Sequence, residues 1–204
     1  MTLASSNLEA FLSSHDRVRW DSRHAVSGGA EQPASFLREI IESSHWEIPR
    51  GRALDVACGK GRNALFLAEQ GFDAVALDIA PVALKEARRR VQGKSLTITW
   101  QQADLEQVQL PENSFDLVVN FNYLQRSLIP QIKSALRAGG HVIFETYLID
   151  QIAIGHPKNP NYLLAHNELL NHFRDFRVLL YREGKLADGS EPSFRAGIFA
   201  RKIG

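Results

Sequence analysis

The sequence predicts an α/β fold built on a mostly parallel sheet, and three observations carry this prediction. Short apolar runs alternate with stretches of helical spacing through residues 52–147. A glycine-rich turn follows the first run, and two β-rich runs joined by a polar turn close the chain. Such alternation is typical of βαβ units with parallel strands. We therefore expect seven strands, five parallel ones and a final pair with one antiparallel member, and helices on both faces of the sheet.

The first part of the chain predicts four strands and the helices around them. Apolar or β-rich runs place the strands at residues 52–56, 73–78, 96–101 and 114–120. The helices are expected at residues 36–43, 63–70, 81–91 and 128–137. Pro81 suits the first turn of the third helix, because its missing N–H has no helical partner there. Gly139 and Gly140 are expected to end the fourth helix.

The last part of the chain predicts a fifth strand, an irregular segment and a closing pair of strands. Residues 141–147 form the fifth strand, and residues 148–164 carry Gly155, Pro157 and Pro160. Loops of this length in a compact domain are often functional, and the apolar residues near its end favour an ordered wall over a site. A short helix is expected at residues 167–173, before two β-rich runs at 174–183 and 193–202.

Composition indicates a globular protein of one domain. The chain has 204 residues, of which 44% are hydrophobic and 23% charged, with a formal net charge of +1. This balance implies no strong field for nucleic acids or membranes, so we expect neither as a partner. The single cysteine, the lack of a 20-residue apolar run and the absence of a signal-like start favour a cytoplasmic protein. We expect a monomer or a weak homodimer.

The glycine-rich turn predicts a cofactor site and leaves two cofactors in competition. Gly59 and Gly61 lie between the first strand and the helix that follows, where backbone N–H groups can face a ligand. The spacing fits the dinucleotide fingerprint, with Asp78 at about the expected distance. It also fits D-x-G-x-G-x-G from Asp55, which resembles motif I of the class I S-adenosylmethionine-dependent methyltransferases. Asp55 would repel a pyrophosphate but attract a cofactor that carries ammonium and sulfonium groups. Asp55 could instead cap the following helix.

Polar side chains also follow the next three strands, at the edge where open α/β sheets bind ligands. Asp78 could accept from both ribose hydroxyls or cap the next helix. Asp104 lies in a loop that resembles the family's adenine-binding loop, where it would accept from the exocyclic amine; alone it would be a surface acid. The fourth strand delivers Asn120. The residues expected to hold the cofactor within the domain are Asp55, Ala57, Cys58, Gly59, Gly61, Asn63, Asp78, Ile79, Ala103, Asp104, Leu105 and Asn120.

Nearly the whole chain resembles the tellurite-resistance (TehB-like) branch of the class I methyltransferases, a Rossmann-like fold. The resemblance rests on residues 55–63, 115–119, 137–140 and 174–202. It implies an N-terminal helical segment and linker, residues 1–33, that covers the cofactor, and a methyltransferase domain, residues 34–204. Within that segment, Trp20 would pack on the cofactor and Arg23 would pair with its carboxylate; a solvated helix anchored by Trp20 is the alternative. Ala57 departs from the family's usual glycine and fits if its φ is negative.

The resemblance implies S-adenosylmethionine as cofactor, S-adenosylhomocysteine as product, and a small-molecule acceptor. A soft acceptor such as a metalloid oxyanion or a thiol would need little base catalysis, whereas a hydroxyl or amine would need a base. The acceptor candidates are Asn122, Tyr123, Arg126, Glu145, Tyr147 and Tyr162. Histidine spacing predicts no metal site. Two alternatives remain open: an NAD(P)-dependent oxidoreductase, for which Tyr181 and Lys185 match a dehydrogenase pair, and a non-catalytic cofactor-binding sensor or partner subunit.

Overall fold

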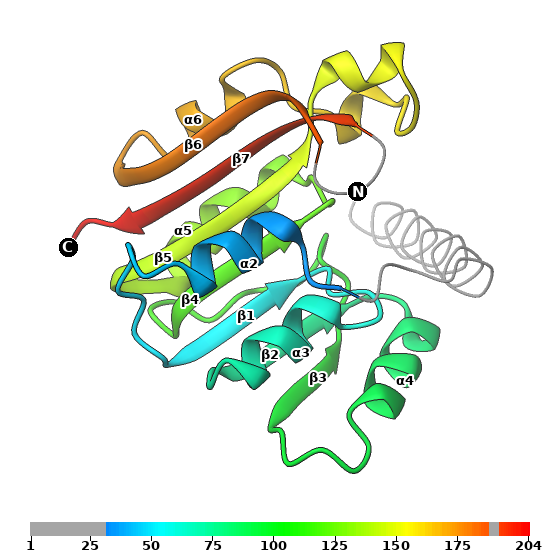
Figure 1. The fold of residues 1–204 in the computed structure, drawn as a ribbon, viewed down its shortest axis with the longest axis vertical. Coiled ribbons are helices and arrows are strands. Elements are labelled where there is room, and N and C mark those ends of the chain that lie inside the picture. The colour runs from blue at the N-terminus through cyan, green and yellow to red at the C-terminus, as the bar shows by residue number, and fades with distance from the viewer. Residues whose placement is uncertain (1–31, 188–191) are drawn as a thin grey trace, which may run out of the picture.

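A computed structural model of the protein describes residues 32–187 and 192–204, and these form one seven-stranded sheet with helices on both sides (Figure 1). The strand order is β3-β2-β1-β4-β5-β7-β6. The first five strands pair in parallel, whereas β7 pairs antiparallel with both β5 and β6. This confirms the predicted fold class. Residues 1–31 of the segment expected to cover the cofactor lie outside the described residues.

The observed strands are close to the predicted runs. They are β1 Arg52–Val56, β2 Asp73–Asp78, β3 Ile98–Gln102, β4 Phe115–Phe121, β5 Leu136–Tyr147, β6 Phe176–Leu186 and β7 Ser193–Lys202. The described helices are α2 Ser35–Glu42, α3 Arg62–Glu69, α4 Pro81–Arg90, α5 Ile129–Ala135 and α6 Glu168–His172. Three 3₁₀ turns complete the elements: η1 Arg126–Leu128, η2 Ile149–Ala153 and η3 Pro160–Tyr162.

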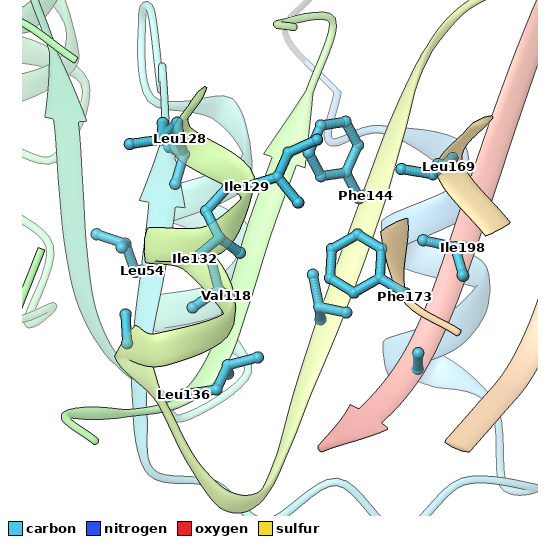
Figure 2. Close-up of a cluster of buried hydrophobic side chains, with 14 of the residues drawn as sticks. Leu54, Val118, Leu128, Ile129, Ile132, Leu136, Phe144, Leu169, Phe173 and Ile198 are labelled. Atoms are coloured by element: carbon cyan, nitrogen blue, oxygen red, sulfur yellow. The ribbon is translucent and has the colours of Figure 1, made fainter. Parts of the chain in front are cut away.

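The alternation of side chains along each strand divides the apolar core into two layers. On one face, α5 and α6 cover the sheet, and Ile129 and Ile132 of α5 belong to the same cluster as Leu54 of β1, Val118 of β4 and Phe144 of β5 (Figure 2). On the other face, α2 and α3 pack on the intervening strand residues, and α4 lies beside α3 over β2 and β3 (Figure 1). Both faces of the central strands are therefore covered.

The boundary between α5 and β5 differs from the prediction. The helix expected over residues 128–137 ends at Ala135, and β5 begins at Leu136. Leu136 pairs with Phe115, and the register then shifts before Leu117 pairs with His141. Gly139, with φ 78°, lies in this irregular stretch rather than at a helix end. Pairing with β4 therefore overrides the local helical preference of residues 136–137.

Parallel strands bring the ends of β1 to β5 to one edge of the sheet, which orients the candidate site. The turns after β1, β2 and β4 and the loop after β3 all lie at this carboxyl edge. In the part of the chain that the structure describes, no helix is long and apolar enough to span a bilayer.

Candidate functional site

The turn between β1 and α3 is compact and left-handed at three positions. Ala57, Gly59 and Gly61 have φ values of 54°, 55° and 76°. A Cβ on Gly61 would lie 2.4 Å from Cη2 of Trp100, so only glycine fits against this ring. The expectation that Ala57 has a negative φ is therefore wrong. Its backbone adopts the conformation that glycine tolerates best, because the turn must reverse direction within a few residues of β1.

Asp55 is buried at the end of β1, with 1% of its surface exposed. Its Oδ2 accepts a hydrogen bond from Ala64 N at 3.0 Å, which is the third N–H of α3. This is a contact to the start of the helix, the alternative that the sequence left open. The other oxygen, Oδ1, is buried and has no hydrogen-bond partner. Burial raises the pKa of Asp55 to about 7.

Asp78 fixes the glycine turn from the end of β2. Its Oδ2 accepts from Gly59 N at 2.7 Å and its Oδ1 accepts from Ala80 N at 2.9 Å. Ala80 immediately precedes α4, so Asp78 orders both the turn and the entry to this helix. A carboxylate has about four acceptor positions, so these two bonds leave capacity for ligand hydroxyls. The next residue, Ile79, is half-buried, and its carbonyl accepts from Gln102.

Asp104 and Asn120 extend the site along the carboxyl edge. Asp104 Oδ1 accepts from Glu106 N at 2.9 Å, while its Oδ2 is buried without a partner. Asn120 donates from Nδ2 to the Tyr123 carbonyl at 2.8 Å, while its Oδ1 is also buried without a partner. Next to Asp104, Ala103 donates its N–H to the Asp78 carbonyl, and Leu105 is buried.

Unpartnered buried oxygens provide a test of whether these residues fit the expected cofactor. Among the described residues, four buried side-chain atoms lack a partner, and three of these belong to Asp55, Asp104 and Asn120. Buried acceptors are normally paired, so a cluster of orphans at one edge is unusual. All three are oxygens. S-adenosylmethionine offers the complementary groups, because it carries an amine on adenine and cationic groups at its other end. The residues therefore fit this cofactor.

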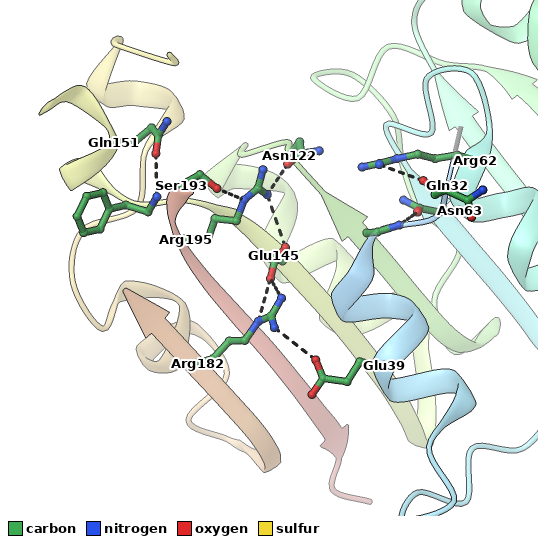
Figure 3. A network of polar contacts seen from close by, with 12 residues as sticks. Gln32, Glu39, Arg62, Asn63, Asn122, Glu145, Gln151, Arg182, Ser193 and Arg195 are labelled. Atoms are coloured by element: carbon green, nitrogen blue, oxygen red, sulfur yellow. Dashed lines mark hydrogen bonds and ion pairs between the residues drawn. The ribbon is translucent and has the colours of Figure 1, made fainter. Parts of the chain in front are cut away.

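Cys58 and Asn63 have structural contacts in the same turn. Cys58 is buried, its N–H donates to the Leu77 carbonyl, and burial raises the pKa of its thiol. Asn63 Oδ1 accepts from Ala34 N at 2.9 Å and so connects the start of α3 to the start of α2. Its neighbour Arg62 donates to the Gln32 carbonyl at 3.2 Å (Figure 3). Trp20 and Arg23, expected to cover the cofactor, lie outside the described residues.

A buried ion-pair network lies at the end of β5, on the face that α2 covers (Figure 3). Glu145 is 3% exposed and pairs with Arg182 of β6 at 2.6 Å and with Arg195 of β7 at 3.5 Å. Arg182 also reaches Glu39 of α2 at 3.4 Å and lies 4.2 Å from the centre of the Phe36 ring. The network therefore ties the antiparallel strands to α2.

Arg195 presents its guanidinium at the carboxyl ends of β4 and β5. It donates to Asn122 Oδ1 at 2.6 Å and to Ser193 Oγ at 2.8 Å (Figure 3). It also stacks 4.2 Å from the centre of the Tyr147 ring. Three acceptor candidates, Asn122, Glu145 and Tyr147, thus meet around one arginine. Arg62 of α3 also lies within electrostatic range of Arg195, Glu145 and Tyr147.

The structure places the other acceptor candidates away from this arginine. Arg126 pairs with Glu168 at 2.6 Å and donates to the carbonyls of Asn161 and Leu163. Its charge therefore holds the segment before α6. Tyr123 packs against the α5-side core and donates to Gln125. Tyr162 lies on η3 and is 39% exposed.

Sequence reasoning missed Arg62, Arg182 and Arg195 as members of this edge. The positions of Arg182 and Arg195 depend on pairing between distant segments: Tyr147 pairs with Arg195, and Gly197 pairs with both Glu145 and Arg182. Arg62 instead begins α3, directly after Gly61 of the glycine turn. A signal for Arg195 was available, since Arg195 and Gly197 are two residues apart and must share a face of β7. The sequence did not indicate which face of the sheet this is, because that depends on the pairing register of β5 and β7.

Two further features of the described residues bear on the alternatives. Tyr181 and Lys185 lie on the strand β6, and the Tyr181 hydroxyl donates to Glu183, so they do not form a helical dehydrogenase pair. No group of three or more His, Cys, Asp and Glu side chains in the described ranges could hold a metal ion.

A hollow of about 330 Å³ lies on the α5 side, between α5, α6 and the β6–β7 pair. Its lysines bind helix ends: Lys133 donates to the His172 carbonyl and Lys202 to the Leu136 carbonyl. Its lining contains none of the residues of the glycine turn or of the Glu145 network. We therefore assign the candidate site to the carboxyl edge of the sheet.

Comparison with known proteins agrees with this geometry. A family described as a methyltransferase domain matches residues 53–140. A Haemophilus influenzae protein named "Probable S-adenosyl-L-methionine-dependent methyltransferase TehB" is 27% identical over 140 residues, which are 65% of this chain and 48% of the relative. The 2-heptyl-1-hydroxyquinolin-4(1H)-one methyltransferase of Mycobacteroides abscessus is 32% identical over 90 residues, 44% of this chain and 38% of the relative.

Solved structures show the same fold. The crystal structure of TehB from Haemophilus influenzae aligns with a TM-score of 0.64 at 24% identity, over 74% of this chain and 57% of that one. An S-adenosylmethionine-dependent methyltransferase from Mesorhizobium loti aligns with a TM-score of 0.63 at 21% identity, over 79% and 95%. The chain spans about half the length of the curated relatives it matches first. Over residues 53–140 the chain is therefore similar to a methyltransferase domain, and its described residues share the fold of solved S-adenosylmethionine-dependent methyltransferases.

Proposed function

We propose that this protein transfers a methyl group from S-adenosylmethionine to a small-molecule acceptor. The observation that carries the proposal is the set of unpartnered buried oxygens on Asp55, Asp104 and Asn120 at the carboxyl edge of the sheet. A pyrophosphate over the glycines would lie beside Asp55 and would be repelled by its ionised form. A cationic cofactor without phosphate suits the same charges, which favours the methyltransferase over the dinucleotide enzyme.

The residues that would hold the cofactor divide by the chemistry they offer. Asp78 would accept from the ribose hydroxyls and Asp104 from the adenine amine. Asp55 supplies negative charge beside the turn, and the glycines let the backbone approach closely. When bound, S-adenosylmethionine supplies a methyl group on a sulfonium, a leaving group that is already cationic. The protein then contributes mainly by aligning the acceptor with that methyl group.

We propose a soft nucleophile, such as a metalloid oxyanion or a thiol, as the acceptor. The arginines around Glu145 hold positive charge at the end of β5. Positive charge there favours a nucleophile that is ionised before it binds. Among the relatives, one is named for a hydroxyquinolinone, so small heterocycles form the second acceptor class to test.

Calorimetry tests the cofactor assignment directly. We expect S-adenosylhomocysteine to bind and NAD not to bind. Replacing Asp78 by Ala should weaken the binding of S-adenosylhomocysteine by roughly 1–3 kcal/mol, because the ligand's ribose hydroxyls would lose a buried acceptor. Asp73→Ala is the matched control, since Asp73 lies at the opposite end of β2 and its side chain is 59% exposed. Tight NAD binding without S-adenosylhomocysteine binding would refute the cofactor assignment.

An acceptor screen tests the reaction. Methyl-labelled S-adenosylmethionine is incubated with tellurite, selenite, small thiols and small heterocycles, and transfer of label is measured. We expect label on one of these acceptors with the wild-type protein and much less with Asp78→Ala at the same cofactor concentration. Tight S-adenosylhomocysteine binding with no transfer to any acceptor would favour the non-catalytic sensor.

A further inference from the structure

Asp55 differs from the other acid of the glycine turn in how its charge is accommodated. Asp78 accepts two backbone N–H groups, one on each oxygen. Asp55 accepts one, from Ala64, and its second oxygen is buried without a partner. An ionised carboxylate buried in this way loses hydration without full replacement. The neutral, protonated form of Asp55 avoids this penalty.

The groups around Asp55 reinforce the difference. Its strand neighbours are the apolar Val119 of β4 and Ala76 of β2. Among the described residues, the titratable or charged groups that act on it are Arg62 of α3, Asp78 of β2 and the Cys58 thiol. Burial raises the pKa of Asp55 to about 7, and the charge of Asp78 raises it too, whereas the Ala64 N–H and Arg62 lower it.

Resting on the proposed function, we infer that Asp55 carries a proton in the ligand-free protein and releases it to solvent when the cationic cofactor binds. Ligand cations near the turn favour the ionised form of a neighbouring carboxyl. One O–H bond of Asp55 breaks, the proton passes to buffer, and the carboxylate charge is compensated by the ligand. Cofactor affinity is then linked to pH by the same proton.

Calorimetry on the wild-type protein tests this inference without any variant. S-adenosylhomocysteine, which carries the ammonium group, is titrated in two buffers of different ionisation enthalpy at pH 6.0 and again at pH 8.5. We expect release of about 0.9 proton per site at pH 6.0 and almost none at pH 8.5, with affinity rising about tenfold per pH unit below pH 6.5. Binding at pH 6.0 with no proton release would overturn the inference.

Two variants assign the proton to Asp55. Asp55→Asn should abolish the release at pH 6.0, whereas Asp104→Asn, at another acid of the same edge, should retain it. If Asp55→Asn does not fold, infrared spectroscopy of the wild-type protein gives the answer, because a protonated carboxyl band should vanish when S-adenosylhomocysteine is added. Release that persists in a folded Asp55→Asn, or no such loss of the band, contradicts the assignment. Absence of S-adenosylhomocysteine binding at every pH would instead refute the proposed function.

Discussion

Gly197 of β7 lies directly opposite Glu145 of β5, and its missing side chain makes room for the buried carboxylate. A Cβ at position 197 would come within 3.1 Å of Glu145 Oε2 and 3.0 Å of Cε1 of Phe36. Both groups are held in place, the carboxylate by Arg182 and Arg195 and the ring by the core under α2. The glycine is therefore a packing requirement of the ion-pair network.

Gly197→Ala should destabilise the protein by about 1–3 kcal/mol, because the added methyl group must displace the carboxylate or the ring. The free energy of unfolding in denaturant measures this. Gly155→Ala is the matched control, since a Cβ there would lie 3.4 Å from the Gln151 side chain, an ordinary contact. Equal stability of the two variants would show that β5 and β7 can separate enough to accept the methyl group.

Removing Arg182 should destabilise the fold more than an exposed arginine does. Arg182 makes the shortest ion pair of the buried Glu145, so Arg182→Ala should cost about 2–4 kcal/mol. The double variant Glu145→Gln with Arg182→Gln should lose less than the sum of the two single glutamine changes, because it removes both charges of this pair at once. Arg89→Ala is the control and should change stability little, since its pair with Glu86 is exposed. Additive losses in the double variant would contradict the coupling.

The fold could be predicted from the sequence where local patterns and tertiary pairing agree. β2 begins and ends where the apolar run does, because both of its faces are buried. At Leu136 the local pattern and the tertiary pairing disagree, since a helical pattern continues into residues that pair with β4. The same distinction decides which residues of the candidate site could be predicted. Asp78 follows its strand in sequence, whereas the meeting of Arg195 with Tyr147 depends on a register between segments about fifty residues apart.

Ala57→Gly should stabilise the protein. Ala57 has φ 54°, and this left-handed conformation costs a residue other than glycine roughly 1–2 kcal/mol. Glycine avoids this cost, but its greater flexibility in the unfolded chain cancels a part of the gain. We expect a net gain of about 0.5–1 kcal/mol, seen as a rise of roughly 1–4 °C in the melting temperature. Ala165→Gly, at an exposed loop position where φ is not positive, should lower the melting temperature. A lower melting temperature for Ala57→Gly would mean that its methyl group makes contacts worth more than the strain.

His141 should make the fold sensitive to mild acid. Burial lowers its pKa to about 4, from an ordinary value of 6.5, and its ring stacks on Phe199. Between these pH values the unfolded chain binds a proton that the folded state does not, so stability falls as pH drops from about 6.5 to 4. His141→Leu should lose this dependence. The difference in unfolding free energy between wild type and variant, measured from pH 7 to pH 4, reports it.

Asp55 affects the pH dependence of stability in the opposite direction to His141, so the two residues can be compared in the same protein. Its pKa is raised from 3.8 to about 7, so the folded state binds the extra proton and stability falls as pH rises through this range. The two groups therefore oppose each other between about pH 4 and 6.5. Relative to wild type, Asp55→Asn should steepen the acid loss, whereas His141→Leu should reduce it. A change of the same sign in both variants would show that other groups dominate.

Asp104→Asn should alter which base the site prefers while leaving the fold intact. Asp104 Oδ2 is buried without a partner, and an asparagine nitrogen at this position would face an adenine amine donor with another donor. We expect S-adenosylhomocysteine to bind roughly 1–3 kcal/mol more weakly. The inosine analogue, which has an oxygen in place of the amine, should bind the variant better than it binds wild type, because the new donor meets an acceptor. Equal losses for both ligands would place Oδ2 away from the base, since only a contact with the exocyclic group can reverse the preference.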